Sequence, residues 1–229
     1  MVAAWAREGL AARGVLLDEV SSGQLCAARR WEHRVSSEGA SLELQLADGR
    51  LVRGGDVRSV LNRLTAVPVD WLREVATQDR DYAYAEFTAL LCSAFHALSC
   101  PVLNRPSPAG LGGRWRDDVE WAVLAGRAGL TVPELGVSSD RYAAAEAAPG
   151  EGWHVFAVEG RVVAPTSLPA PAAEACARLA HAAGDALLGI ELVPADVATG
   201  AAFRRATALP DFRSGGDPLL DALAGALGR

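Results

Sequence analysis

The chain has 229 residues, of which half are hydrophobic and 22% are charged, and its formal net charge is −6. This composition is typical of a globular protein with one large domain or two small lobes, and the acidic balance argues against nucleic-acid binding. All 22 residues counted as lysine or arginine are arginine, which excludes reactions that need a lysine, such as Schiff-base formation. No apolar run reaches the roughly 20 residues of a membrane helix, and no secretion signal is expected at the N-terminus.

Hydrophobic periodicity in the first half of the chain predicts an α/β arrangement. Segment 41–46 alternates leucines with Glu43 and Gln45, as a half-buried strand does, and Asp48 and Gly49 then form a hairpin turn. The expected elements are a helix at 3–13, strands at 15–17, 31–35, 41–46, 50–52 and 59–64, and a helix at 79–98.

The second half predicts a mixed α+β lobe. Gly129 ends one helix, and Glu159 and Gly160 form the turn of a compact hairpin. The acidic, alanine-rich segment 138–152 is interpreted as a connection. The expected elements are a strand at 101–103, a helix at 117–128, hairpin strands at 153–158 and 161–164, a helix at 171–188, antiparallel strands at 189–193 and 202–207, and a helix at 217–227.

The cysteines and histidines form no recognisable catalytic or metal-binding pattern. The four cysteines are Cys26, Cys92, Cys100 and Cys176, and none belongs to a C-x-x-C pair. Free, mostly buried thiols in a reducing cytoplasm are therefore expected. His96 and His154 are the histidines to consider for acid–base chemistry, with packing near a helix end as the competing interpretation for His96.

The order of several short motifs suggests a family. These motifs are LNRLTAVP at 61–68, PVLNRP at 101–106, WAVLAGRAGLTVPEL at 121–135, HVFAVEGRVVA at 154–164 and GIELV at 189–193. Their succession resembles that of the ATP-grasp ligases, especially the graspetide and microviridin macrocyclases. The resemblance implies a pre-ATP-grasp-like α/β lobe over 1–135 and a reduced ATP-grasp-like α+β lobe over 136–229.

The resemblance also implies where the sequence departs from the family. In these ligases, lysines hold the phosphates of ATP, and acidic and amide residues on the last two strands hold magnesium. Glu191 occupies the first carboxylate position, but Arg205 and Thr207 fall where a glutamate and an asparagine are expected. Arg114 and Arg116 lie where the family often has a lysine. A cation at a ligand position repels a metal ion, so no metal ligands are assigned.

Other candidate ligand-binding residues follow strands. Asn104 and Arg105 open a loop after the strand at 101–103, where α/β proteins often bind ligands. Arg63 lies near the end of the strand at 59–64. Together with Arg114 and Arg116, these arginines suit a small anionic ligand such as a carboxylate or phosphate. The competing interpretations are a tight Pro/Gly-rich loop, an ion pair of Arg63 with Asp70 or Glu86, and chance clustering in an arginine-only sequence.

Three functional hypotheses follow. The first is a cytoplasmic pseudoenzyme without a cofactor, which serves as a binding or accessory protein in a biosynthetic pathway of peptide modification. It would bind a peptide, a partner protein or a small anion, with a homodimer left open. The second is an ATP-dependent carboxylate–amine ligase that uses ATP and magnesium, with arginine in place of lysine. The third is an enzyme of different chemistry that reuses a cleft between the lobes.

Overall fold

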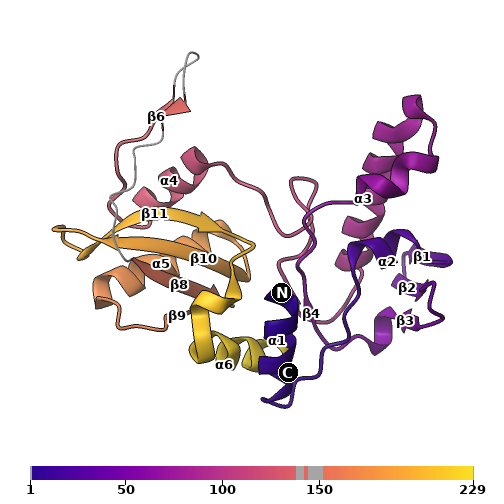
Figure 1. Cartoon of the computed structure of the whole chain (residues 1–229), viewed down its shortest axis with the longest axis horizontal. Coiled ribbons are helices and arrows are strands. Elements are labelled where there is room, and N and C mark those ends of the chain that lie inside the picture. The colour runs from indigo at the N-terminus through magenta and orange to yellow at the C-terminus, as the bar shows by residue number, and fades with distance from the viewer. Residues whose placement is uncertain (1, 138–141, 144–151, 229) are drawn as a thin grey trace. The chain divides into compact units, whose positions relative to one another are not determined.

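The computed structural model describes residues 2–137, 142–143 and 152–228 (Figure 1). They form two compact units. The segment before Leu17 joins Arg116–Ala226 in what we call the C-terminal unit, whereas Leu17–Trp115 and the last residues of the chain form the N-terminal unit. The expected lobe boundary between residues 135 and 136 stays a prediction.

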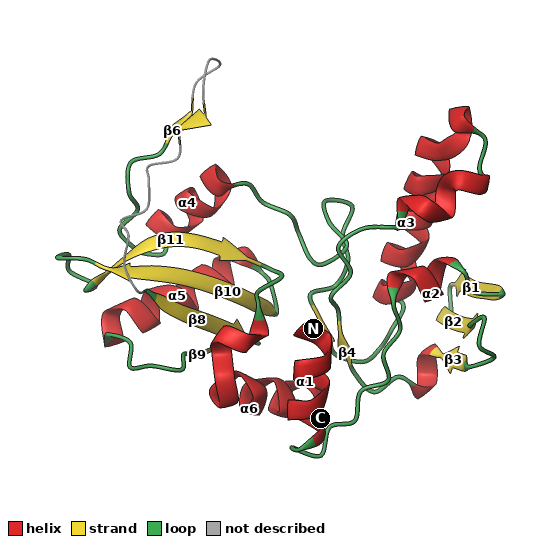
Figure 2. Cartoon of the chain, in the orientation of Figure 1, coloured by secondary structure: helices red, strands yellow, loops and turns green. Residues whose placement is uncertain are grey.

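A four-stranded antiparallel sheet forms the centre of the C-terminal unit (Figure 2). Its strands lie in the order β11 (Ala201–Thr207), β10 (Leu187–Pro194), β8 (Trp153–Val158) and β9 (Arg161–Val163). Glu159 and Gly160 both have positive φ angles, 48° and 81°, in the tight turn between β8 and β9. The hairpin and the antiparallel strand pair expected from the sequence are confirmed.

Helices pack against one face of this sheet. On that face, α4 (Asp118–Arg127) and α5 (Ala170–Ala183) pack against Val155, Ile190 and Leu192, which are buried in one apolar cluster. Asp117 caps α4 by accepting a hydrogen bond from the Glu120 backbone N–H at 2.7 Å. Each buried aliphatic side chain of this kind contributes about 1.5–3 kcal/mol to folding.

The opposite face is covered over part of its length. The segment that contains η4 (Phe212–Gly215) and α6 (Gly216–Leu227) crosses it, with α1 (Val2–Ala11) packed alongside. The approach is close: a Cβ atom added to Gly189 would lie 2.5 Å from Cβ of Pro210, and one added to Gly215 would lie 2.9 Å from Phe156. Gly189 on β10 and Gly215 in the covering segment therefore leave no room for a larger residue.

The N-terminal unit holds two separate sheets. An antiparallel sheet of β1 (Arg30–Ser36), β2 (Gly39–Gln45) and β3 (Leu51–Arg53) packs against α3 (Arg80–His96). Leu44, Phe87 and Leu91 are buried between them, and Trp31 contacts Phe87 edge to face at 5.9 Å between ring centroids. β4 (Val60–Leu61) and β5 (Val102–Leu103) form a short parallel pair. The smaller elements are α2 (Ser22–Cys26), η1 (Gly54–Asp56), η2 (Val69–Glu74) and η3 (Thr77–Asp79).

Three expected element boundaries are wrong. Segment 15–17 forms no strand, because it pairs with no described neighbour and leaves Leu16 exposed. The strand at 59–64 is only Val60–Leu61, since the Asn62 side chain accepts the Leu64 backbone N–H at 3.1 Å and turns the chain. The helix at 171–188 ends at Ala183, where Gly184 adopts a left-handed conformation with φ of 70°.

Two further findings concern the rest of the chain. The expected connection 138–152 lies almost wholly outside the described residues; at its edge, β6 (Gly136–Val137) pairs with β7 (Tyr142–Ala143). Among the described helices, none combines the length and apolar character needed to cross a membrane. The mixed α/β class is confirmed.

Candidate functional site

Three ionisable side chains line up across the open end of the C-terminal sheet. Glu191 on β10 lies directly opposite Arg205 on β11 and His154 on β8. Directly opposite residues of antiparallel strands point to the same face. Arg205 Nη2 therefore donates to Glu191 Oε1 at 2.5 Å, and His154 Nδ1 lies 3.8 Å from the same oxygen. We call these three residues the charged row.

The charged row is the part of this face that the η4–α6 segment leaves uncovered. Gly189 and Phe156 come next on the same face and are buried beneath that segment. The Glu191 side chain, by contrast, is 20% exposed, and the Arg205 side chain is 66% exposed. Because Ile190 and Leu192 belong to the buried cluster on the other face, strand alternation places Glu191 on the open side.

A β-bulge adds a second arginine beside the charged row. The register shifts between Glu191 and Leu192: Leu192 pairs with Phe203, whereas Glu191 pairs with Arg205. Arg204 is therefore the extra residue on β11. Arg204 and Arg205 are both exposed, so this end of the strand presents two neighbouring guanidinium groups to solvent.

The charge of Glu191 is neutralised within the protein. The hydrogen bond to Glu191 raises the pKa of the Arg205 guanidinium above its ordinary value, and the negative charges of Glu191 and Asp118 add to the effect. Arg205 thus stays protonated at every physiological pH. The carboxylate that the resemblance places next to magnesium has an arginine as its counter-ion.

These side chains do not fit a magnesium ion. Magnesium prefers oxygen ligands in octahedral geometry and is bound in proteins mainly through carboxylates. The charged row offers the carboxylate of Glu191 and places a permanent cation 2.5 Å from it. In the described part of the chain, no group of three or more His, Cys, Asp or Glu residues could hold a metal ion.

The fold can be compared with solved structures. No protein-family model and no curated protein sequence matches the chain. The macrocyclase MdnB from Microcystis aeruginosa MRC matches 99% of this chain and 94% of its own, with a TM-score of 0.68 and 14% identity. A RiPP-associated ATP-grasp ligase from Chryseobacterium gregarium, solved with ADP and a leader and core peptide, matches 97% of this chain and 91% of its own, with a TM-score of 0.73 and 10% identity. The ATP-grasp ligase PsnB, solved with a minimal precursor, Mg and ADP, matches 100% and 95%, with a TM-score of 0.67 and 17% identity.

The chain has the ATP-grasp fold. The similarity spans nearly the whole length of both partners in each comparison. This confirms the ATP-grasp resemblance of the motif order at the level of the fold. Sequence identities of 10–17% leave the residues of the site to be judged on their own chemistry.

The Arg105 side chain is hydrogen-bonded to the C-terminal end of α3. Its guanidinium donates to the backbone carbonyls of Phe95, Leu98 and Cys100, the last two at 3.1 and 3.0 Å. These carbonyls lie at and just beyond the helix C-terminus, where a cation is favoured by the helix dipole. Arg105 therefore fastens the loop after β5 to α3, and its expected role in ligand binding stays a prediction.

Asn104 lies at the start of the same loop and is buried. Its φ angle of 62° is unusual for a residue other than glycine but is tolerated by asparagine. The Asn62 side chain donates to the carbonyl oxygens of Asn104 at 2.6 Å and Leu111 at 2.7 Å. The two asparagines therefore brace the loop from inside, and sequence reasoning missed this role of Asn62.

The remaining arginines occupy different surroundings. Arg116 belongs to the C-terminal unit, where its guanidinium donates to Asp185 at 2.7 Å and to the carbonyl of Ala183 at the end of α5. It also lies 4.8 Å over the Trp121 ring. Arg63 is half-buried and Arg114 is exposed, both in the N-terminal unit. Of the seven predicted ligand-binding residues, the structure pairs Glu191 with Arg205.

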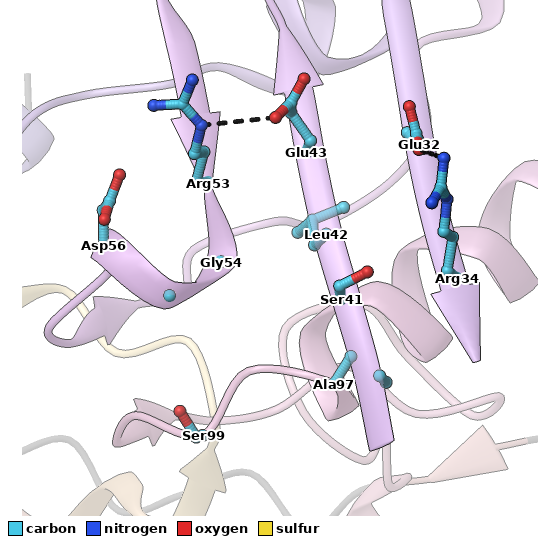
Figure 3. A pocket seen from close by; sticks show the side chains of 12 residues that line it. Glu32, Arg34, Ser41, Leu42, Glu43, Arg53, Gly54, Asp56, Ala97 and Ser99 are labelled. Carbon is cyan, nitrogen blue, oxygen red and sulfur yellow. Dashed lines mark hydrogen bonds and ion pairs between the residues drawn. The ribbon is translucent and has the colours of Figure 1, made fainter. Parts of the chain in front are cut away.

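A hollow that sequence reasoning missed is bordered by β1, β2 and β3, by η1, and by Ala97 and Ser99 after α3 (Figure 3). It has a volume of about 480 Å³. Glu32 there pairs with Arg34, and Glu43 accepts a hydrogen bond from Arg53 at 3.3 Å. The sequence signal was the alternation of polar or charged residues with other residues along 30–34 and 41–45. This hollow offers balanced charge pairs rather than one dominant sign.

Proposed function

We propose that this ATP-grasp-fold protein is a pseudoenzyme of peptide modification, a binding or accessory protein that does not hold magnesium-bound ATP at its C-terminal sheet. The observation that carries the proposal is the 2.5 Å ion pair between Glu191 and Arg205. An arginine replaces the metal as the partner of the carboxylate. The absence of lysine from the sequence removes the usual compact cation for phosphate contacts.

The peptide part of the proposal is supported by the fold neighbours. The macrocyclase MdnC was solved with the precursor peptide MdnA, and PsnB with the precursor peptide PsnA2. In this chain, Arg204 and Arg205 give the open face an excess of positive charge over Glu191. An acidic peptide is the partner that this face suits best. A cytoplasmic location belongs to the same proposal and is supported by four free cysteines.

Titration calorimetry tests the nucleotide part. Mg-ATP and Mg-ADP are titrated into the wild type, R205A, and R161A, which removes an exposed arginine from the same sheet as a matched control. We expect no saturable heat for the wild type or R161A at nucleotide concentrations up to about 1 mM. Micromolar binding by the wild type would overturn the proposal.

Fluorescence polarisation tests the peptide part. A labelled oligoglutamate peptide and its oligoglutamine counterpart are the probes. We expect the wild type to bind the oligoglutamate, with an affinity that falls at least about tenfold in the R204A/R205A double variant and that weakens with added salt. Equal binding of the two peptides, or no change in the double variant, contradicts the assignment of this face.

The second candidate is an ATP-dependent carboxylate–amine ligase. Glu191 favours it, because its carboxylate remains on the open face. In this reaction a substrate carboxylate attacks the γ-phosphorus of ATP, ADP leaves, and an amine displaces phosphate from the acyl phosphate. Release of ADP that requires both the oligoglutamate peptide and an amine, and that is lost in E191Q, would establish the ligase and reject the pseudoenzyme.

A further inference from the structure

The longest unpaired strand edge in the described part of the chain belongs to β1. This strand has seven residues and pairs with β2 on one side only. The other edge strands are shorter or partly covered. β3 and β9 have three residues each. On β11, the backbone N–H of Phe203 donates to the carbonyl oxygen of Thr131 at 2.8 Å. An exposed edge of this length is a ready template for another strand.

The hydrogen-bonding pattern identifies which backbone groups of β1 face outward. Ser36 and Gly39 flank the two-residue hairpin loop and pair directly. In an antiparallel ladder, hydrogen-bonded pairs alternate with non-bonded pairs, so Arg34 and Glu32 also bond to β2. The N–H and C=O groups of Trp31, His33 and Val35 consequently point to the open edge.

The side chains of β1 are complementary to the same strand running in the opposite direction. Consider a second copy of β1 placed antiparallel, with His33 opposite His33 of the copy. Glu32 then lies opposite Arg34 of the copy, and Arg34 lies opposite its Glu32. On the other face, Trp31 lies opposite Val35. Glu32 and Arg34 each meet the opposite charge, Trp31 and Val35 meet each other, and Arg30 lies opposite the neutral Ser36, which is a favourable arrangement for cross-strand pairs.

Neighbouring registers lack this complementarity. A shifted register keeps the hydrogen bonds between the two copies of β1 only if the outward N–H and C=O groups of Trp31, His33 and Val35 still face the same set of groups in the copy. Centring the pair on Glu32 places two glutamates opposite each other and Arg30 opposite Arg34. Centring it on Arg34 places two arginines opposite each other. Like charges directly opposite destabilise a strand pair, so the register centred on His33 is selected.

The surroundings of β1 leave room at the end of the strand. Val35 is 70% exposed, so no described segment covers it. The His33 ring is held back over its own unit, with Nε2 2.8 Å from Ser93 Oγ and Nδ1 3.0 Å from the Ser41 carbonyl oxygen. Glu32 and Arg34 lie on the outer face, along the hollow shown in Figure 3, and are directed away from the core.

We propose that two copies of this chain associate through antiparallel pairing of their β1 strands, in the register that places Glu32 of each copy opposite Arg34 of the other. The pairing joins two three-stranded sheets into one continuous sheet with about six new main-chain hydrogen bonds. The symmetry is two-fold, which is the commonest for homo-oligomers. The contact is small, so the dimer is a weak one.

The test is sedimentation velocity on the full chain between about 5 and 500 µM, a range suited to a small interface. We expect a wild-type dimer, and R34E should weaken association at least about tenfold because it places Glu32 opposite a glutamate twice. The double swap E32R/R34E restores opposite charges and should return association to near the wild-type strength. R161E, on the edge strand of the other sheet, is the matched charge-reversal control and should not change association.

Two further samples separate the proposed register from a general effect of charge. E32R carries arginines at both positions and R34E carries glutamates, so each alone should be monomeric while their equimolar mixture forms a dimer. V35P removes one outward N–H group without touching the ladder to β2 and should also weaken association. A wild type that stays monomeric at the highest concentration, or a double swap that fails to restore the dimer, overturns the proposal.

Discussion

Replacing Arg116 by alanine should destabilise the C-terminal unit far more than replacing Arg205. Both arginines pair with a carboxylate at short range, 2.7 Å for Arg116 with Asp185 and 2.5 Å for Arg205 with Glu191. They differ in burial: the Arg116 and Asp185 side chains are 4% and 6% exposed, whereas Arg205 is 66% exposed. Burial therefore decides the size of the effect.

The magnitudes follow from what each substitution leaves behind. R116A leaves the buried Asp185 without its guanidinium partner, which costs about 3–5 kcal/mol. R205A leaves Glu191 in contact with water, and an exposed pair of this kind is worth about 0–1 kcal/mol. The double variant R116M/D185L replaces the buried pair by apolar groups and should recover much of the stability that R116A loses.

Urea unfolding followed by tryptophan fluorescence measures these differences. We expect the midpoint of R116A to fall by about 1 M or more at an unchanged slope, and that of R205A to stay close to the wild type. If R116A costs less than about 1 kcal/mol, Arg116 is not held by Asp185 as the structure shows. Its guanidinium would then be available to an anionic ligand.

Three further predictions concern packing, thiol chemistry and pH. G189A places a methyl group 2.5 Å from Pro210 and should cost about 1–3 kcal/mol by urea unfolding; G225A, whose added Cβ meets nothing within 4 Å in α6, should instead stabilise by about 0.5–1 kcal/mol. Burial raises the pKa of the Cys176 thiol to about 12, so Cys176 should resist iodoacetamide at pH 8 in the native protein, and its rapid labelling would contradict the buried position. Hydrogen bonds from the Arg50 backbone and side chain lower the pKa of the Asp48 carboxyl. The ionised Asp48 carboxylate should therefore stabilise the folded state above about pH 4, and this stabilisation should be lost as the pH falls further. D48N should flatten the acid limb of the curve of stability against pH, measured by thermal unfolding.

The elements that could be predicted from sequence are those with strong local signals. The helix at 117–128 is confirmed as α4 because Asp117 supplies its N-cap and Gly129 follows its end. The strand at 189–193 is confirmed as part of β10, since its apolar run is interrupted only by Glu191. In each case neighbouring residues in the sequence carry the information.

The features that could not be predicted depend on distant parts of the chain. Leu187 and Leu188 continue the apolar spacing of α5, and this spacing competes with the stop signal of Gly184, which places them in the next strand. The guanidinium of Arg105 reaches carbonyls at the end of α3, a contact that exists only once the β5 loop has folded back. The resemblance placed Glu191 and Arg205 on neighbouring strands, and the structure pairs the two residues. Their role in ligand binding stays a prediction.

The bulge on β11 makes Arg204 dispensable to the core. The ladder runs from Phe203 opposite Leu192 directly to Arg205 opposite Glu191. Deleting Arg204 would therefore give a regular strand in which every later residue keeps its partner and its side of the sheet. The second guanidinium can be gained or lost by a one-codon insertion or deletion, so natural variants of this protein can adjust the charge of the open face without repacking the interior.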